Sequence, residues 1–332
     1  MSYTDNRFIS KGSYVQGLLN NNDCNRAHFV RITATTGNTT VTLKDKDAVT
    51  IGTVLIYSAG ETIVVEKHPS HLLTTDQSVY ATGETDKSIA GSGIGSVVSD
   101  APTSLQVWYD GSDSTQFIPN NPSDGDTFTQ WTDKSNFAHN ANPTGGASTR
   151  PTFRTNVQNS LSIVRFDGTN DCLSINPVAW TQSLSGMSLL IVSKATVATG
   201  TKTLITSDQD DMGIYINGSN NLEVSMNAVT GATATAADTN WHIHSLNFDG
   251  SQTGNADRLV YRLDGAAQSL TFTGTVAATT NASNGDFTVG CDSAAEFWNG
   301  DIGEIIMFNR TLTSGEVSGL ESYLSDRWDI TI

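Results

Sequence analysis

Apolar residues are most densely patterned near the C-terminal end of the chain, in residues 298–309, which read WNGDIGEIIMFN. Read as a β-strand, in which side chains alternate between two faces, this segment is largely apolar on both sides. One face holds Ile302, Glu304, Ile306 and Phe308, and the other holds Gly303, Ile305 and Met307. A strand with two apolar faces is covered on both, so the pattern predicts a central strand of a layered structure.

The segment that follows, residues 313–328, has the pattern of an amphipathic helix. Thr313 and Glu316 have the spacing of a capping box, which satisfies two free backbone amides at a helix start. Four apolar residues then recur at helical intervals on one side: Val317, Leu320, Leu324 and Trp328. One such helix at the end of a β-rich chain predicts a cover over a sheet and not a scaffold for catalysis.

Short runs of alternating apolar and polar residues fill the first part of the chain, separated by residues typical of turns. The runs lie at 28–34, 40–43, 51–57, 62–66 and 78–82. They predict a small antiparallel β module over residues 1–90. A stretch rich in Gly and Ser follows and ends near Pro102, which predicts a linker at residues 91–103.

From residue 104 the alternating pattern starts again. Roughly ten to fourteen short strands fit between there and the predicted helix, with turn residues between them. This pattern predicts two packed antiparallel sheets. The expected fold class is all-β: the small N-terminal module, then a two-sheet sandwich over residues 104–332, closed by one short C-terminal helix.

Charge narrows the choice of partners. The chain has 18 basic and 34 acidic residues, for a net charge of −16, which repels nucleic acid and anionic membrane surfaces. Residues 1–100 hold 8 of the basic and 10 of the acidic residues, so the acidity belongs mainly to the second part. This division suggests a docking segment followed by a displayed, solvated domain, or two domains of unrelated charge. The sequence has no apolar run of the roughly 20 residues that a membrane helix needs.

The N-terminus lacks the basic start and apolar core of a secretory signal, which predicts synthesis in the cytoplasm. The three cysteines, Cys24, Cys172 and Cys291, lack metal-site spacing, and only one pair of them can form a disulfide. Free thiols in a reducing compartment are the expectation, although Cys172 and Cys291 fall near strands that can be neighbours. Whether those two are bonded is left open by the sequence.

A series of motifs in residues 104–332 resembles the laminin-G-like, concanavalin A-like jelly-roll domains. In order, they are WYDGSD, WTDKSN, RPTF, VRFDGTND, a WHI strand and NGDIGEIIMFNRTLT. The resemblance implies a curved two-sheet sandwich. Such domains serve as lectins, adhesion modules, glycoside hydrolases and spacers, so it implies little about function.

A second resemblance covers residues 41–73, VTLKDKDAVTIGTVLIYSAGETIVVEKHPSHLL. This segment is similar to a short β module in structural proteins of marine tailed phages, especially those of cyanobacteria. It implies a virion protein.

Candidate catalytic residues are few. A retaining glycosidase needs two carboxyl groups about 5–5.5 Å apart on one face. Asp301 and Glu304 are three residues apart, which in a regular strand puts them on opposite faces, so we expect Glu304 to be a structural carboxylate bonded to nearby backbone. His242 and His244 share a strand face, with no nucleophile motif beside them. The sequence therefore predicts a protein that is not an enzyme.

Two candidate binding sites stand out. Asp208, Asp210 and Asp211 cluster carboxylates at a turn and suit calcium, although acidic turns are common for reasons of turn geometry alone. Trp180, Phe297 and Trp298 lie beside turn residues and are candidates for stacking on a sugar, with packing at the edge of the core as the alternative. Trp108, Trp131 and Trp241 lie inside strand-like runs and are assigned to the core.

These observations favour a phage virion protein, most simply a capsid decoration or cement protein. Its N-terminal module would dock on the major capsid protein or another virion protein and its acidic jelly roll would point outward. A homo-oligomer is expected, a trimer if it follows virion symmetry, with no cofactor apart from the calcium considered above. The alternative is a carbohydrate-binding adhesion module of a tail or surface protein that recognises glycans. A glycoside hydrolase comes third.

Overall fold

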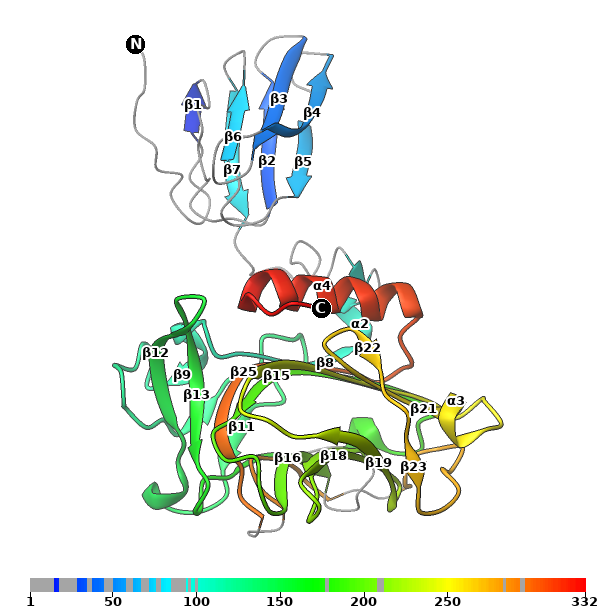
Figure 1. The fold of residues 1–332 in the computed structure, drawn as a ribbon. Helices are drawn as coiled ribbons and strands as arrows, with labels where there is room; N and C mark the ends of the chain where they lie inside the picture. The colour runs from blue at the N-terminus through cyan, green and yellow to red at the C-terminus, as the bar shows by residue number, and fades with distance from the viewer. Residues whose placement is uncertain are drawn as a thin grey trace. The chain divides into compact units, whose positions relative to one another are not determined.

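The computed structural model describes residues 15–17, 29–34, 38–44, 50–57, 62–66, 72–75, 79–84, 94, 97–98 and 101–332, except 177–178, 208–211, 283–284 and 293–295. The chain divides into two compact units, residues 1–99 and residues 100–332. Each unit is a separate body with its own sheets (Figure 1).

The first unit contains two small antiparallel sheets. One has the order β1 (Val15–Gly17), β7 (Val79–Glu84), β2 (Phe29–Ala34), β5 (Thr62–Glu66). The other has the order β4 (Thr50–Ile56), β3 (Thr39–Lys44), β6 (Leu72–Thr75). The predicted β module is confirmed. The two strands that the sequence missed, β1 and β6, are only three and four residues long, too short to show an alternating pattern.

The second unit is a sandwich of two antiparallel sheets. The β16 sheet contains, in spatial order, β23 (Thr271–Phe272), β19 (Val229–Ala236), β18 (Asn221–Met226), β17 (Gly213–Ile216), β16 (Lys202–Ser207), β24 (Phe287–Val289), β14 (Leu173–Ile175), β11 (Ala141–Pro143), β10 (Gln130–Trp131) and β9 (Phe117–Ile118). The β25 sheet contains β12 (Thr152–Gln158), β13 (Leu161–Asp167), β25 (Asn299–Phe308), β15 (Gly186–Ala195), β20 (Trp241–Asp249), β21 (Leu259–Leu263) and β22 (Ala266–Ala267), with β8 (Leu105–Asp110) also paired to β25.

Short helical segments lie in the connections of this unit. They are α2 (Ala101–Ser104), η2 (Ser114–Gln116), η3 (Ala147–Thr149), η4 (Ala179–Thr181) and α3 (Asn255–Arg258). The longer helix α4 (Ser314–Trp328) follows β25. The all-β fold with a single C-terminal helix of this length in the described residues confirms the predicted fold class, including the two-sheet sandwich that the jelly-roll resemblance implies.

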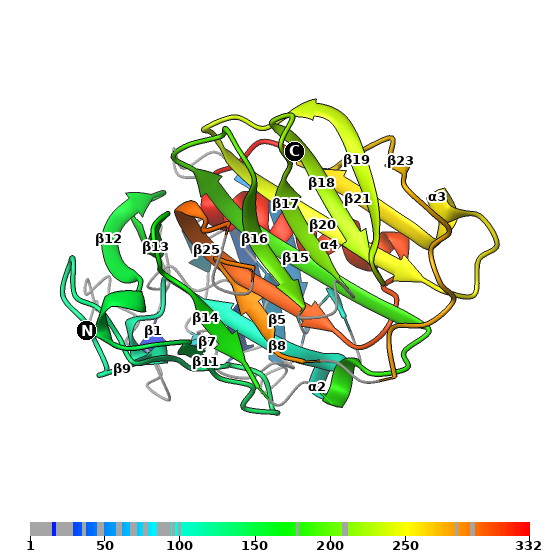
Figure 2. The ribbon, with the colours of Figure 1, turned by 90° about the horizontal axis from the view of Figure 1, so that it is seen from below.

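The hydrophobic core fills the space between the two sheets, which Figure 2 shows lying one behind the other. Alternation sends one set of side chains from each strand into this space: from the β25 sheet, these include Val107, Tyr109, Leu189, Ile191, Ile305 and Met307. Burying each such side chain contributes about 1.5–3 kcal/mol. Trp131 and Trp108 are buried as predicted, and Trp108 lies on the side of the sheet that α4 covers. Trp241 is only partly buried, contrary to the prediction, and stacks on Trp328.

Helix α4 covers the other face of the β25 sheet, as Figure 1 shows. The predicted capping box is present, with Thr313 and Glu316 each accepting a hydrogen bond from the backbone amide of the other. The buried side of the helix includes the four predicted apolar residues, Val317, Leu320, Leu324 and Trp328. The helix is therefore a cover over the sheet, as the sequence predicts.

Strand β25 is the central strand of its sheet, as predicted, but its two faces differ from the prediction. It pairs with β15 along one edge, and with β13 and then β8 along the other. Opposite Val192 and Ser193 of β15, the pairing jumps from Glu304 to Ile302, so Gly303 is the extra residue of a β-bulge. A β-carbon at Gly303 would lie 2.8 Å from the Trp328 ring, which explains why glycine occupies the bulge.

The bulge corrects two predictions. Ile302 joins Ile305 and Met307 in the core between the sheets, instead of sharing a face with Glu304. Asp301 and Glu304 pair with Lys194 and Val192, which are two residues apart on β15, so both carboxylates project from the face that α4 covers. The expectation that they lie on opposite faces was wrong because it assumed a regular strand.

Candidate functional site

A polar cleft of about 670 Å³ opens in the second unit, where β13, β25 and β15 meet the loop before β12. Three cationic side chains line it, Arg150, Arg165 and Lys194, together with three carboxylates, Asp167, Asp171 and Asp301. Neutral hydrogen-bonding side chains complete its walls: Ser148, Thr152, Thr196, Thr239 and Asn299. Ligand sites in proteins typically measure about 300–1,000 Å³, so the cleft has the size for a small molecule or a few sugar rings.

Strand register brings the floor of the cleft together. On β13, Val164 and Phe166 point into the core, so Arg165 between them points to the opposite face. Arg165 is opposite Asp301 of β25, and Asp301 is opposite Lys194 of β15. A row of three charged side chains therefore crosses three neighbouring strands on one face.

Arg165 and Asp301 form a two-pronged ion pair. The Arg165 Nε donates to Asp301 Oδ1 at 2.6 Å, and Nη2 donates to Oδ2 at 2.8 Å. Asp301 is buried, and its hydrogen bonds raise the pKa of the Arg165 guanidinium above its usual range. Because both oxygens of Asp301 are engaged, this pair acts as a fixed element of the cleft floor.

A tight turn, residues 167–171, forms another wall. Asp167 Oδ1 accepts a hydrogen bond from the Thr169 amide at 2.7 Å, and Asp171 Oδ2 accepts one from the Asp167 amide at 2.8 Å. Gly168 has a φ of +75°, which favours glycine, and a β-carbon there would also lie 2.5 Å from that of Asn299. The backbone conformation and the close approach of Asn299 thus both require glycine in this turn.

Asp171 is the carboxyl group of the cleft with the most unusual environment. Its side chain is buried, and burial, together with the charge of Asp167, raises its pKa to about 6. The amide of Asp167 works in the opposite direction and limits the rise. Asp171 therefore changes charge close to neutral pH, while it faces the cleft.

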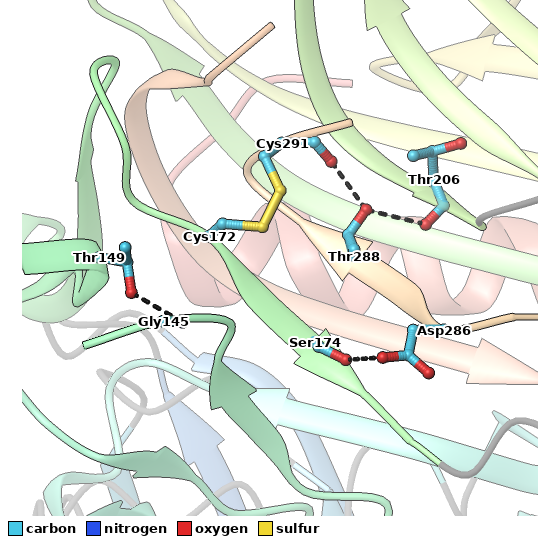
Figure 3. Close-up of a disulfide and its surroundings, with 8 residues drawn as sticks. All are labelled: Gly145, Thr149, Cys172, Ser174, Thr206, Asp286, Thr288 and Cys291. Carbon is cyan, nitrogen blue, oxygen red and sulfur yellow. Dashed lines mark hydrogen bonds between the residues drawn. A yellow bond between two sulfur atoms is a disulfide. The ribbon is translucent and has the colours of Figure 1, made fainter. Parts of the chain in front are cut away.

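A disulfide between Cys172 and Cys291 holds this turn in place (Figure 3). The two cysteines flank β14 and β24, whose residues Leu173 and Val289 are paired. Thr288 Oγ1 donates to the carbonyl of Cys291 at 2.7 Å. The expectation of free thiols was wrong for these two residues because the strands that carry them are neighbours. Cys24 lies outside the described residues.

The cations Arg150 and Lys194 lack the carboxylate partner that Arg165 has in Asp301. Neither side chain makes a hydrogen bond or an ion pair with any residue that the structure describes, and the Nε of Arg150 is buried with no partner among those residues. A buried N–H group without an acceptor costs about 1–3 kcal/mol. The cleft therefore contains donors that the described protein leaves unsatisfied.

The residues predicted to stack on sugars lie elsewhere. Trp298 is 3% exposed and packs in the core. Trp180 is partly buried and stacks on His139, at 5.2 Å between ring centroids, and on Phe287. Phe297 is partly exposed and forms an isolated bridge with Thr203. None of the three lines the cleft, and their role in sugar binding stays a prediction.

The predicted calcium ligands, Asp208, Asp210 and Asp211, lie outside the described residues. Among the residues that are described, no group of three or more His, Cys, Asp or Glu side chains is arranged to hold a metal ion. Nor does any described helix have the length and apolar character to cross a membrane.

Glu304, the other candidate carboxylate, is fully buried between α4 and the sheet. Its oxygens accept hydrogen bonds from the Trp108 indole at 2.8 Å, the Trp328 indole at 2.9 Å and the Tyr323 hydroxyl at 3.0 Å. Burial raises its pKa, and Arg327 opposes this shift. Glu304 is a structural carboxylate, as expected, but its partners are side chains and not the predicted backbone groups.

The two histidines share a face of β20, as expected. His242 lies between two carboxylates, with Nδ1 2.6 Å from Asp264 and Nε2 2.9 Å from Asp238. The Nδ1 of His244 lies 2.7 Å from the Tyr261 hydroxyl, and burial lowers its pKa to about 3. These contacts join β20 to β21 and to the loop before β20. The two histidines therefore have a structural role.

Several solved structures resemble this chain at low sequence identity. No protein-family model matches the sequence, and no curated protein matches it. Trypanosoma rangeli sialidase in complex with sialic acid is 12% identical, with a TM-score of 0.47 over 80% of this chain and 42% of that one. The ligand binding domain of botulinum neurotoxin serotype D in complex with N-acetylneuraminic acid is 10% identical, with a TM-score of 0.47 over 70% and 53%.

The CBM40 of Ruminococcus gnavus IT-sialidase, bound to α2,3-sialyllactose, is 13% identical, with a TM-score of 0.35 over 42% of this chain and 83% of that one. With 42% of the Trypanosoma rangeli sialidase chain covered, this chain spans less than half the length of that protein. No activity, ligand or partner is carried over from these structures. The predicted link to phages stays a prediction.

Proposed function

We propose that residues 100–332 form a carbohydrate-binding module and that its ligand binds in the polar cleft. The observation that carries this proposal is the composition of the cleft walls, which join hydroxyl, amide, carboxylate and cationic groups from separate segments. Each sugar hydroxyl both donates and accepts hydrogen bonds, so a saccharide needs donors and acceptors side by side. Asn299, Thr196 and Thr239 provide both kinds of group, while Arg165 and Asp301 fix the floor.

Binding without catalysis is the simpler reading of the carboxylates. Asp301 is engaged at both oxygens by Arg165, and Asp167 accepts hydrogen bonds from the amides of its own turn. A glycosidase that uses two carboxyl groups needs a second one free to act beside the first. Asp171 alone fits such a role, which supports a binding protein over a hydrolase.

A screen of the full chain against neutral and acidic glycans tests the proposal. The cleft is blocked in Thr196→Trp, because Thr196 is an exposed residue of its wall and an indole there occupies the ligand space. Thr199→Trp is the matched control, since Thr199 is exposed in the same loop and does not line the cleft. We expect Thr196→Trp to weaken glycan binding about tenfold or more, a loss of about 1.4 kcal/mol.

The control variant should bind as the unmodified chain does. Equal binding by both variants would place the ligand elsewhere, and a complete lack of glycan binding by the unmodified chain would remove the proposal. Thermal unfolding of each variant serves to confirm that both are folded.

We propose as a second candidate the virion role, in which residues 1–90 dock on a virion protein and the sandwich is displayed. The division of the chain into two compact units supports such a separation of roles. Co-sedimentation of the full chain with phage particles that lack it tests this idea. The chain is expected to sediment with the particles. If it binds none of the candidate particles, the result counts against the virion role.

A further inference from the structure

We propose that the saccharide bound in this cleft is acidic, and that its carboxylate or sulfate group pairs with Arg150 and Lys194. This inference rests on the proposed function of the same cleft and names the chemical class of its ligand. It follows from the distribution of charge partners among the described residues.

Arg150 is an exception among the arginines of the second unit. Six others donate to a carboxylate or a backbone carbonyl: Arg154, Arg165, Arg258, Arg262, Arg310 and Arg327. Arg150 has no such acceptor among the described residues, and its Nε is buried. Because a guanidinium presents its donors in a planar fork that suits carboxylate or sulfate oxygens, the missing acceptor is naturally an oxyanion.

Lys194 adds a second unpaired cation to the same cleft. It stands next to Asp301 in the strand register, but both oxygens of that carboxylate are taken by Arg165. The side-chain amine of Lys194 makes no ion pair or hydrogen bond with the described residues. Two cations that line one cleft without partners form an anion site, while the hydroxyl and amide groups around them suit the rest of a sugar.

The surrounding charge limits the size of the anion. The chain has a net charge of −16, which repels long polyanions such as nucleic acids. The two unpaired cations both line the cleft, where only one acidic group of a ligand needs to enter. A short acidic oligosaccharide, or the acidic end of a longer glycan, fits this pattern.

Protonation of Asp171 should tune the affinity. The charged groups that share the cleft with it are Asp167 and Arg165 on β13, Arg150 before β12, Lys194 on β15 and Asp301 on β25. When Asp171 is protonated, three cations face two carboxylates. Ionisation of Asp171 as the pH rises through about 6 adds a third negative charge, so an acidic ligand should bind more weakly above that pH.

Calorimetric titration with matched probes tests the inference. Oligogalacturonate and its full methyl ester have the same ring hydroxyls and differ in charge, and α2,3-sialyllactose and lactose form a second pair. The acidic member of at least one pair should bind about tenfold more tightly than its neutral partner at pH 5.5. Raising the pH to 7.5 should weaken only the acidic probe, by a factor on the order of three.

Variants separate charge recognition from a loss of structure. Arg150→Gln and Lys194→Gln should each lower the affinity for the acidic probe about tenfold and leave the neutral probe within about twofold. Arg154→Gln is the control, because Arg154 lies on β12 just after Arg150, pairs with Asp124 and does not line the cleft. It should bind both probes as the unmodified chain does.

The outcomes distinguish this inference from the function on which it rests. If acidic and neutral probes bind equally and Thr196→Trp abolishes both, the cleft binds sugars but the acidic ligand is wrong. If no saccharide binds at all, both proposals fail. Sodium sulfate alone is the third probe: competition with the acidic sugar is expected, and sulfate binding without any saccharide binding would overturn the inference.

Discussion

Glu304→Gln tests how the helix is held on its sheet. Glu304 is 0% exposed and receives the Trp108 indole and the Tyr323 hydroxyl at Oε1, and the Trp328 indole at Oε2. Arg327 Nε lies 3.3 Å from Oε2. Glutamine keeps one oxygen but replaces the other with an NH2 group, which points hydrogens at groups that also donate.

The loss of stability in Glu304→Gln can be worked out from the donors that lose their acceptor. One or two buried donors become unsatisfied, each at a cost of about 1–3 kcal/mol, while relief of repulsion from the nearby Asp110 offsets part of the loss. We expect a net loss of about 2–4 kcal/mol in the free energy of unfolding. For a domain of 150–250 residues this lowers the melting temperature by about 4–16 °C.

Equilibrium unfolding in urea at pH 7, followed by tryptophan fluorescence, measures the loss. Glu223→Gln is the matched control, because Glu223 is partly exposed and accepts one hydrogen bond, from Asn217 Nδ2 at 3.0 Å. It should change stability by less than about 1 kcal/mol. If Glu304→Gln also stays within that range, the buried carboxylate does not hold α4 on the sheet and the reasoning is wrong.

Two further predictions concern the disulfide and the histidines. Replacing both Cys172 and Cys291 by Ser frees a loop of 119 residues and should lower the free energy of unfolding, measured in urea, by about 2–5 kcal/mol. Glycan affinity should also fall, because the adjacent turn at Asp171 loosens. An unchanged unfolding midpoint would refute the stability prediction. His244, with its pKa lowered to about 3, should keep a constant NMR shift from pH 7.5 to 4.5, whereas His242, whose two carboxylate partners raise its pKa, should titrate above its usual value of about 6.5. A His244 shift that moves between pH 6 and 7 would contradict the burial argument.

The C-terminal strand and helix could be predicted well from the sequence because their signals are local. The apolar run in residues 302–308 and the capping box at Thr313 each depend on a few adjacent residues. The bulge at Gly303 could not be predicted, since it depends on the pairing of β25 with β15 and on the Trp328 ring above it. One extra residue was enough to reverse the expected relation between Asp301 and Glu304.

The cleft was missed because its residues come together only through strand register. Arg165, Lys194 and Asp301 are far apart in the sequence, and each lies in a strand with an apolar run. A charged residue inside such a run was the available signal, since it must find a partner or face solvent. The aromatic residues drew attention instead, although Trp298 is a core residue and Trp180 packs against the core.

An NMR titration of the isotopically labelled chain with the acidic oligosaccharide tests the central claim most directly. The account predicts amide shift changes centred on the turn at Gly168 and Thr169, on Asn299 and on the end of β15 near Lys194, with little change near Trp180. Changes that cluster around Trp180 and Phe297 would place sugar binding at the aromatic positions. An absence of shifts with every acidic and neutral probe would contradict a carbohydrate-binding cleft.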